Sequence, residues 1–334
     1  MPAFFTVLIP FRNAEKTLAE TLDSVRVQTN PNWEMLLVDD HSTDSSGNLA
    51  LEYAARDERI RVLTHPGKGI VDALNRGIQE VRSPWVVRMD ADDRCHPRRL
   101  EWTLEGIQIA PDVSVWSGLV HCFPEVTPRM QEYIDWLNGI ILPLDFGPEI
   151  FVESPLAHPA TTIQTEALRK VGGYRFGDFP EDYDLWLRLF KTGHSFRKIP
   201  EVILEWRESE ERLSRTDSRY SLESFRAIKA IHLIDHFQLQ NQPVQIWGAG
   251  VEGKKWRKEL EKHGVEVTRF FDVDPRKIGG RVAGRCPVLP WQRMIEFGDC
   301  LTLGAVGNRA ARHKIQTTLQ SMGIENGKEF IFVQ

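Results

Sequence analysis

Apolar runs alternate with amphipathic segments through residue 89 of the chain. Residues 4–10 form a continuous apolar run with β-branched side chains, which is typical of a strand buried on both faces. Residues 14–28 follow with apolar side chains at helical spacing. The same alternation continues in strands at 33–38, 61–64 and 85–89 and in helices at 42–56 and 70–80. Repeated β-α units predict an α/β fold with a parallel sheet covered by helices on both faces.

Three of these strands end in polar residues, at 10–13, 38–41 and 89–92. Ligands of parallel sheets collect at the carboxyl ends of the strands, so we expect these side chains to gather at one edge. Asp90 and Asp92 are two residues apart and point the same way on an extended segment. They can therefore converge on a hard cation such as Mg2+ or Mn2+. A solvated acidic turn is the simpler alternative.

Periodicity continues beyond the acidic turn. It predicts helices at 97–109, 130–142, 180–189 and 222–240, and a strand at 113–120. Residues 207–220 are dense in charge and predict a mobile loop, in which Glu210, Glu211 and Arg212 would be solvated. We expect Asp93 only to cap the helix that follows it.

Composition places the chain in the soluble globular class and suggests two domains. The chain has 334 residues, of which 41% are hydrophobic and 27% charged, and its net charge is -5. A nucleic-acid binder would carry a basic excess that is absent here. The boundary is predicted at residues 241–243, giving domains 1–240 and 241–334.

The sequence predicts a cytoplasmic protein. The four cysteines have no paired spacing, which argues against disulfides and zinc and favours a reducing compartment. The N-terminal apolar run lacks a basic start and a cleavage site, so we interpret it as a strand and not as a signal peptide. No run reaches the ~18 apolar residues that a membrane span requires, which leaves only peripheral membrane contact.

The second domain begins with a glycine-rich turn between a strand and a helix. Gly248, Gly250 and Gly253 follow the apolar run 244–247, and Asp272 ends the next predicted strand. This spacing is typical of a dinucleotide-binding loop with a ribose-binding acid. The tail is short and has no evident redox pair. We therefore favour a Rossmann-like half-domain for packing, acceptor binding or dimerisation over NAD(P) binding.

Four motifs, in order and spacing, resemble family 2 glycosyltransferases: Val7-Leu8-Ile9-Pro10-Phe11-Arg12-Asn13, Val38-Asp39-Asp40-His41-Ser42-Thr43-Asp44, Ala73-Leu74-Asn75-Arg76-Gly77-Ile78 and Arg88-Met89-Asp90-Ala91-Asp92-Asp93. The resemblance implies a GT-A fold, a nucleotide-diphosphate sugar donor, most simply UDP-linked, a divalent cation (Mg2+ or Mn2+) and inversion at the anomeric carbon.

The same resemblance assigns roles to residues at the strand ends: Pro10 and Phe11 against the nucleotide base, Asp39 or Asp40 on the base, Asp90 on the ribose and diphosphate side, and Asp92, with Asp90, on the metal. Lys68 would add a cation near the phosphates, although a solvated turn lysine is the simpler interpretation. Asp182 matches the family's general base, which deprotonates the acceptor hydroxyl.

The chain lacks the Gln-x-x-Arg-Trp motif of processive family members; residues 205–207 come nearest to it. This favours transfer of one or a few sugars to a discrete glycan or glycolipid acceptor. The whole chain also resembles beta-1,3-N-acetylglucosaminyltransferase-like proteins, which join a family 2 domain to such a tail, so N-acetylglucosamine is one candidate sugar. An NAD(P)-dependent oxidoreductase and a non-catalytic sugar-nucleotide binding protein are the alternative hypotheses.

Overall fold

The N-terminal apolar run is strand β1 (Phe5–Phe11), and each of its residues is buried. It lies inside a sheet, where β-branched and aromatic side chains pack on both faces. The computed structural model describes residues 3–209, 212–298 and 300–334. Glu210 and Glu211, which the sequence predicts to be solvated, are outside the described residues.

The described chain forms two compact units. The first contains residues 1–143 and 155–217, and the second contains residues 144–154 and 218–334. The helix at 222–236, which the sequence assigns to the first domain, belongs to the second unit by this division. The domain boundary at 241 therefore stays a prediction about which parts fold independently.

The first unit is built on an eight-stranded sheet within the described residues, in the order β3-β2-β1-β4-β7-β6-β8-β5. Its other strands are β2 (Trp33–Asp39), β3 (Ile60–Thr64), β4 (Trp85–Arg88), β5 (Arg94–Cys95), β6 (Val113–Phe123), β7 (Thr162–Gln164) and β8 (Ser195–Arg207). The parallel pairing predicted for the first four strands is confirmed. Beyond β4 the sheet is mixed, because β7 runs antiparallel to both β4 and β6.

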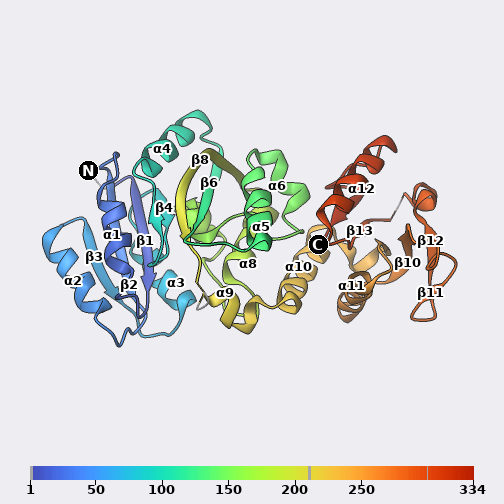
Figure 1. The fold of residues 1–334 in the computed structure, drawn as a ribbon, viewed down its shortest axis with the longest axis horizontal. Helices are drawn as coiled ribbons and strands as arrows, with labels where there is room; N and C mark the ends of the chain where they lie inside the picture. The colour runs from blue at the N-terminus through green and yellow to red at the C-terminus, as the bar shows by residue number, and fades with distance from the viewer. Residues whose placement is uncertain (1–2, 210–211, 299) are drawn as a thin grey trace. The chain divides into compact units, whose positions relative to one another are not determined.

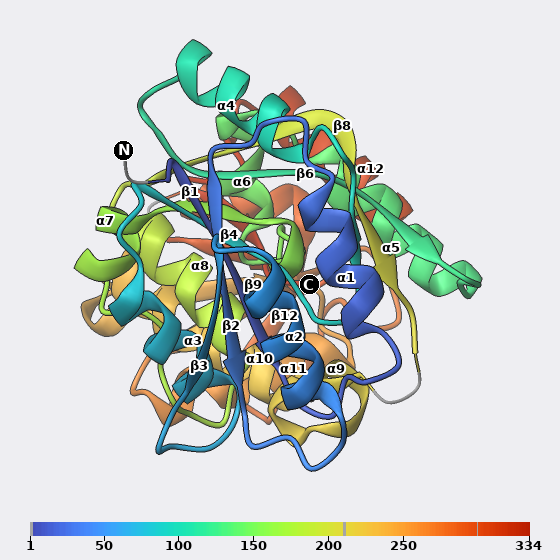
Figure 2. The ribbon, with the colours of Figure 1, turned by 90° about the vertical axis from the view of Figure 1, so that its left-hand side faces the viewer.

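Helices cover both faces of the parallel part, as predicted. They are α1 (Leu18–Arg26), α2 (Ser46–Arg56) and α3 (Ile70–Glu80). Helix α4 (Arg99–Ile109) instead contacts β6 and β8. Figure 2 shows α1 and α2 on one face of β1 and β2, with α3 on the other. This arrangement follows from right-handed crossovers, because the connection through α3 returns across the sheet in the opposite direction.

One glycine lets α3 approach the sheet closely. A Cβ atom on Gly77 would lie 2.2 Å from Leu8 Cδ1 of β1. Since real Cβ atoms do not come so close, any larger residue would force either the Leu8 side chain or α3 to shift. The packing of α3 also brings its residue Asn75 to the loop before α8. There the Asn75 side-chain amide donates to the carbonyl oxygen of Tyr174 and accepts from its backbone N–H.

The remaining helical segments of the first unit surround the mixed part of the sheet. They are α5 (Pro128–Gly139), η1 (His158–Ala160), α7 (Thr165–Lys170), α8 (Glu181–Lys191) and α9 (Leu213–Thr216). The α6 segment (Pro143–Glu149) begins where the first unit gives way to the second. Figure 1 shows α8 in the green part of the ribbon.

The second unit contains its own six-stranded sheet, in the order β11-β12-β10-β9-β13-β14. Its elements are η2 (Ser218–Tyr220), α10 (Leu222–His236), η3 (Leu239–Asn241), β9 (Val244–Trp247), α11 (Val251–Lys262), β10 (Val267–Asp272), β11 (Arg281–Val282), β12 (Cys286–Pro290), η4 (Trp291–Phe297), β13 (Thr302–Gly304), α12 (Arg309–Ser321) and β14 (Phe330–Phe332). All pairs except β11 with β12 are parallel. Among the described helices, none is both long and apolar enough to span a membrane.

Candidate active site

The carboxyl ends of β1, β2 and β4 meet at one edge of the first sheet. Phe11 lies opposite Asp39 in the pairing of β1 with β2, and Leu8 lies opposite Arg88 in the pairing of β1 with β4. Each of these strands then leads directly into its polar turn. The register therefore brings the acidic ends of β2 and β4 to the same edge, as expected for a ligand site in a parallel sheet.

Three carboxylates crowd the turn after β4. One oxygen each of Asp90, Asp92 and Asp93 lies within 4.8 Å of the others. Arg88, which is buried, places Nη1 2.5 Å from Asp90 Oδ1. Burial and the charge of Asp90 raise the pKa of Asp92 to about 6. Burial, followed by the charges of the other two carboxylates, raises the pKa of Asp93 well above its usual value.

This donor set fits a hard divalent cation. All three groups offer oxygen, the ligand that Mg2+ and Mn2+ prefer. The Oδ2 atom of Asp93 is buried and has no hydrogen-bond partner among the described residues. A cation near Asp90 and Asp92 would relieve the mutual repulsion that raises the pKa of Asp92.

Arg207, at the end of β8, forms hydrogen bonds to the acidic turn. Its backbone N–H donates to Asp93 Oδ1 at 2.7 Å, and its Nε donates to the carbonyl oxygen of Asp92 at 2.6 Å. Its guanidinium also pairs with Glu20 of α1. The expectation that Asp93 caps the next helix is wrong, because Arg98 is the N-cap residue of α4.

Arg212 brings a further positive charge toward this turn. Its Nη1 lies 2.8 Å from Glu208 Oε2, and its guanidinium lies 4.2 Å from the centre of the Trp206 ring. The expectation that this side chain is solvated is wrong, since it is only 15% exposed. The charge of Arg212 lowers the pKa of Asp92. Only burial and the charge of Asp90 affect that pKa more strongly. The residue is therefore close enough to act on the acidic turn.

Asp182 lies in the first turn of α8, which begins after the N-cap residue Pro180. Its Oδ1 accepts the backbone N–H of Tyr183 at 2.7 Å. Burial, followed by the adjacent charge of Glu181, raises the pKa of Asp182 to about 7. A carboxyl group with a pKa near neutrality is suited to accept a proton from a substrate hydroxyl. Asp184 points elsewhere, as predicted, and pairs with Arg188 inside the unit.

Two buried polar side chains, Tyr174 and His158, lie near Asp182. Tyr174 Oη is 2.7 Å from His158 Nε2, and both side chains are buried. Burial raises the pKa of Tyr174, and the charge of Asp182 raises it further. Burial and the charge of Arg88 lower the pKa of His158 far below its usual value, so this imidazole is neutral. Arg88 thus influences both the acidic turn and the surroundings of Asp182.

The turn after β2 contains the residues predicted to hold the nucleotide base. Asp39 Oδ1 accepts the backbone N–H of Ser42 at 2.9 Å. Asp40 is buried, and its Oδ1 accepts the backbone N–H of Gly69 at 2.8 Å. Gly69 adopts a φ of 91°, which favours glycine, and this conformation directs its N–H at the carboxylate. Which of the two aspartates contacts the base stays open.

The other predicted donor-binding residues lie around the same edge. Pro10 and Phe11 end β1 and are buried. Lys68 is exposed, and its backbone N–H donates to Asp72 of α3 at 2.8 Å. Its role near phosphates stays a prediction.

In the second unit, Asp272 bonds the glycine-rich turn. Its Oδ2 accepts the backbone N–H of Ala249 at 2.8 Å and lies 3.0 Å from Lys277 Nζ. Gly253 is required here, because a Cβ on it would lie 1.9 Å from the carbonyl oxygen of Gly248. Gly250 precedes α11 as its N-cap residue. The carboxylate of Asp272 therefore already has partners within the turn.

Sequence reasoning missed several residues of the first unit's site. Arg88 could have been recognised, because it is two residues from Asp90 and shares its face of the strand. Tyr174 follows Gly172 and Gly173, a pattern that indicates a turn and gives no sign of a site residue. The contact of Arg207 with Asp93 joins residues 114 positions apart, and no local pattern signals it.

Comparisons with known proteins identify the family of the chain. The family model described as Glycosyl transferase family 2 matches residues 6–171. EpsE of Bacillus subtilis (strain 168), named as a glycosyltransferase, is 30% identical over 225 residues, covering 66% of this chain and 78% of EpsE. The amylovoran biosynthesis glycosyltransferase AmsE of Erwinia amylovora is 27% identical over 214 residues, covering 63% of this chain and 79% of AmsE.

Solved structures agree on the fold. S. aureus TarS 1–349 in complex with UDP-GlcNAc aligns with a TM-score of 0.56 at 17% identity, over 77% of this chain and 70% of TarS 1–349. The fold is that of a glycosyltransferase. The chain belongs to glycosyl transferase family 2. The first unit has the predicted GT-A fold, and a second sheet domain follows it.

Proposed function

We propose that the chain is an inverting, metal-dependent glycosyltransferase that moves a sugar from a UDP-linked donor to an acceptor hydroxyl. The observation that carries this proposal is the gathering of Asp90, Asp92 and Asp93 within 4.8 Å of one another, together with Arg88, which pairs with Asp90 and whose charge also acts on Asp182. A general base near neutrality and a cluster of carboxylates suited to a cation are the two chemical groups that sugar transfer from a nucleotide needs.

In this proposal Asp182 removes the proton of the acceptor hydroxyl as its oxygen attacks the anomeric carbon. The new C–O bond forms on the face opposite the leaving nucleoside diphosphate, whose bond to that carbon breaks, and the configuration inverts. Arg88 is the positive charge that acts on both Asp90 and Asp182. A divalent cation held by Asp92 and Asp90 would supply Lewis-acid stabilisation of the leaving diphosphate.

The donor and acceptor are proposed from the relatives. UDP is supported by TarS, whose structure is a complex with UDP-GlcNAc. An Escherichia coli relative, 26% identical over 246 residues, is named UDP-Gal:alpha-D-GlcNAc-diphosphoundecaprenol beta-1,3-galactosyltransferase. It covers 72% of this chain and 88% of its own length. We therefore propose a glycan or glycolipid acceptor and a hexose or N-acetylhexosamine, with N-acetylglucosamine tested first.

The comparisons give no support to the oxidoreductase alternative. Asp272, the predicted ribose-binding acid, already accepts a hydrogen bond from the backbone N–H of Ala249, which gives no reason to favour NAD(P) binding. Glycan transfer accounts for the acidic turn and Asp182 together, whereas a non-catalytic sugar-nucleotide binder would not need Asp182. The described cysteines are all free, and three of the four are buried. Location in the cytoplasm stays a prediction from their pattern.

The test is nucleotide release and glycan transfer with a panel of UDP-sugars, with Mg2+ or Mn2+ added or chelated. Turnover should require the metal and should fall by about 10²- to 10⁴-fold in Asp182→Asn. Asp178→Asn is the matched control, because Asp178 is an exposed carboxylate in the loop before α8. Transfer that is unchanged by chelation and by Asp182→Asn would contradict the proposal.

A further inference from the structure

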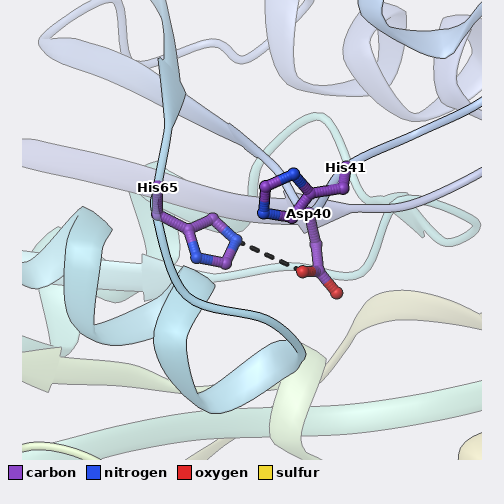
Figure 3. A group of neighbouring side chains, drawn as sticks. All are labelled: Asp40, His41 and His65. Carbon is purple, nitrogen blue, oxygen red and sulfur yellow. Dashed lines mark ion pairs between the residues drawn. The ribbon is translucent and has the colours of Figure 1, made fainter.

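Asp40, His41 and His65 form a second cluster of metal-ligating side chains at the carboxyl edge of the sheet. Asp40 and His41 follow β2, and His65 follows β3. One potential ligand atom from each lies within 4.8 Å of the other two. Figure 3 shows the ring of His65 directed at the Asp40 carboxylate and the ring of His41 close to both. Residues 24 positions apart in sequence are thus brought together by the parallel pairing of β2 with β3.

In the part of the chain that the structure describes, His65 is buried without a hydrogen-bond partner for its ring. Its side chain is 1% exposed, and neither ring nitrogen has a hydrogen-bond partner among the described residues. A buried imidazole without partners is costly, because it loses its bonds to water and gains none in return. Its Nε2 is directed at Asp40 Oδ1, with 3.3 Å between the two atoms.

The distance from His65 Nε2 to Asp40 Oδ1 is compatible with two ligands of one ion. A protein N–H···O bond usually measures about 2.9–3.0 Å. Two ligands placed about 2.0–2.1 Å from a tetrahedral zinc ion lie roughly 3.3–3.4 Å apart. The 3.3 Å separation agrees with the second geometry.

His41 supplies a third ligand from an adaptable position. It is exposed and adopts a φ of 59°, a left-handed conformation that is uncommon outside glycine. Such strained positions concentrate at ligand sites. Its Nε2 is 2.7 Å from the carbonyl oxygen of Gly67. Histidines that bind metals commonly keep a backbone carbonyl on the nitrogen that does not ligate.

We propose that Asp40, His41 and His65 bind a transition-metal ion of the zinc type, at a site separate from the Asp90–Asp93 turn. Two imidazoles and one carboxylate suit zinc and other divalent transition metals, whereas the all-oxygen set after β4 suits Mg2+ or Mn2+. Arg12 opposes cation binding, because its Nη1 lies 3.9 Å from Asp40 Oδ2. Its side chain is 48% exposed, however, and solvent screens the charge.

Occupancy of this site inhibits the transferase. The consequence rests on the proposed function and on assigning the predicted contact with the nucleotide base to Asp40 rather than Asp39. A metal bound by Asp40 withdraws that carboxylate from the base, so zinc and the nucleotide compete. Zinc binding by itself does not depend on the enzyme's activity.

The first experiment titrates the full-length, chelator-treated protein with Zn2+ alone in a calorimeter and with Co2+ in an absorption spectrometer. Wild type should bind one ion per chain at this site, and the cobalt spectrum should show visible ligand-field bands of nitrogen and oxygen ligands. His41→Gly should weaken binding by more than about 10-fold. This variant keeps the fold, because glycine tolerates the left-handed backbone of residue 41.

His65→Gln is the second variant, with circular dichroism as the check on folding, and it should weaken binding to a similar extent. His313→Ala is the matched control, because His313 is an exposed histidine of α12. Zinc binding that is undetectable, or that survives in both His41→Gly and His65→Gln, overturns the metal site.

The second experiment measures UDP affinity at fixed Mg2+ with and without Zn2+. A Zn2+-dependent loss of UDP affinity in wild type that disappears in His41→Gly supports the inhibitory role. Zinc binding that leaves UDP affinity unchanged keeps the metal site but overturns the inhibition, and with it the placement of the base at Asp40. If UDP does not bind under any condition, the proposed donor fails while the zinc titration still decides the metal site.

Discussion

The protonation state of Asp182 should control the pH dependence of transfer. Burial and Glu181 raise its pKa to about 7 from 3.8. A general base acts when it is ionised, so activity should rise with pH through this value. Since each pH unit changes the ratio of the two forms tenfold, about one-tenth of the enzyme is competent at pH 6 and about nine-tenths at pH 8.

The assay is kcat/KM for the donor between about pH 5.5 and 8.5, because this parameter reports ionisations of the free enzyme. Glu181→Gln should move the acidic limb to lower pH, since Glu181 raises the pKa of Asp182. Asp178→Asn should leave the limb in place. A profile that is flat across this range, or that is insensitive to Glu181→Gln, would refute the assignment of the base.

The raised pKa of Asp182 also predicts that the stability of the fold decreases with rising pH, whereas the activity increases. The folded state binds the Asp182 proton more tightly than the unfolded chain, because the folded pKa of about 7 exceeds the ordinary value of 3.8. The free energy of unfolding contributed by this group therefore decreases as pH rises from about 4 to 7. Asp182→Asn, which cannot ionise, should raise Tm relative to wild type by more at pH 8 than at pH 5. An equal change in Tm at both pH values would show that the effect does not come from ionisation.

Three further perturbations test the surroundings of the site. Asp92→Asn should lower metal-dependent turnover by about 10- to 100-fold and raise the Mn2+ concentration needed for half-maximal rate, and an unchanged metal titration would exclude Asp92 as a ligand. Arg207→Lys should lower kcat/KM about 10-fold, because lysine cannot donate to the Asp92 carbonyl and pair with Glu20 in the same geometry; wild-type kinetics would count against this role. Gly77→Val should destabilise the first unit by about 1–3 kcal/mol in urea unfolding, since its Cβ would clash with Leu8 Cδ1; an unchanged midpoint would contradict the close packing of α3.

The parallel half of the first unit could be predicted from the sequence because its elements carry strong local signals. β1 is apolar at nearly every position and is buried throughout. Helix α3 has the predicted bounds, since its buried side chains recur at helical spacing. β8 (Ser195–Arg207) escaped prediction, because charged residues interrupt its apolar positions and its central residues are exposed. Its place in the sheet depends on pairing with β6, which is a tertiary property.

The residues of the candidate site also fall into those that local sequence signals predict and those that depend on tertiary contacts. Residue type and strand position identified Asp90, Asp92 and the acids after β2, because any parallel sheet gathers its strand ends at one edge. Their charge states depend on neighbours that are distant in sequence. Arg207 reaches Asp93 from the end of β8, a strand that the pattern did not reveal.

His65 could have been predicted by applying the rule on the carboxyl ends of parallel strands to β3 as well. It follows β3, whose last residue Thr64 lies opposite Asp39 in the parallel register. The rule that placed Asp40 at the ligand edge therefore places His65 there as well. Its polarity alone gives no reason for burial, yet it is buried beside a carboxylate, and neither ring nitrogen has a hydrogen-bond partner among the described residues. A residue whose position is predictable but whose burial has no local cause is where a ligand is expected to supply the missing partner.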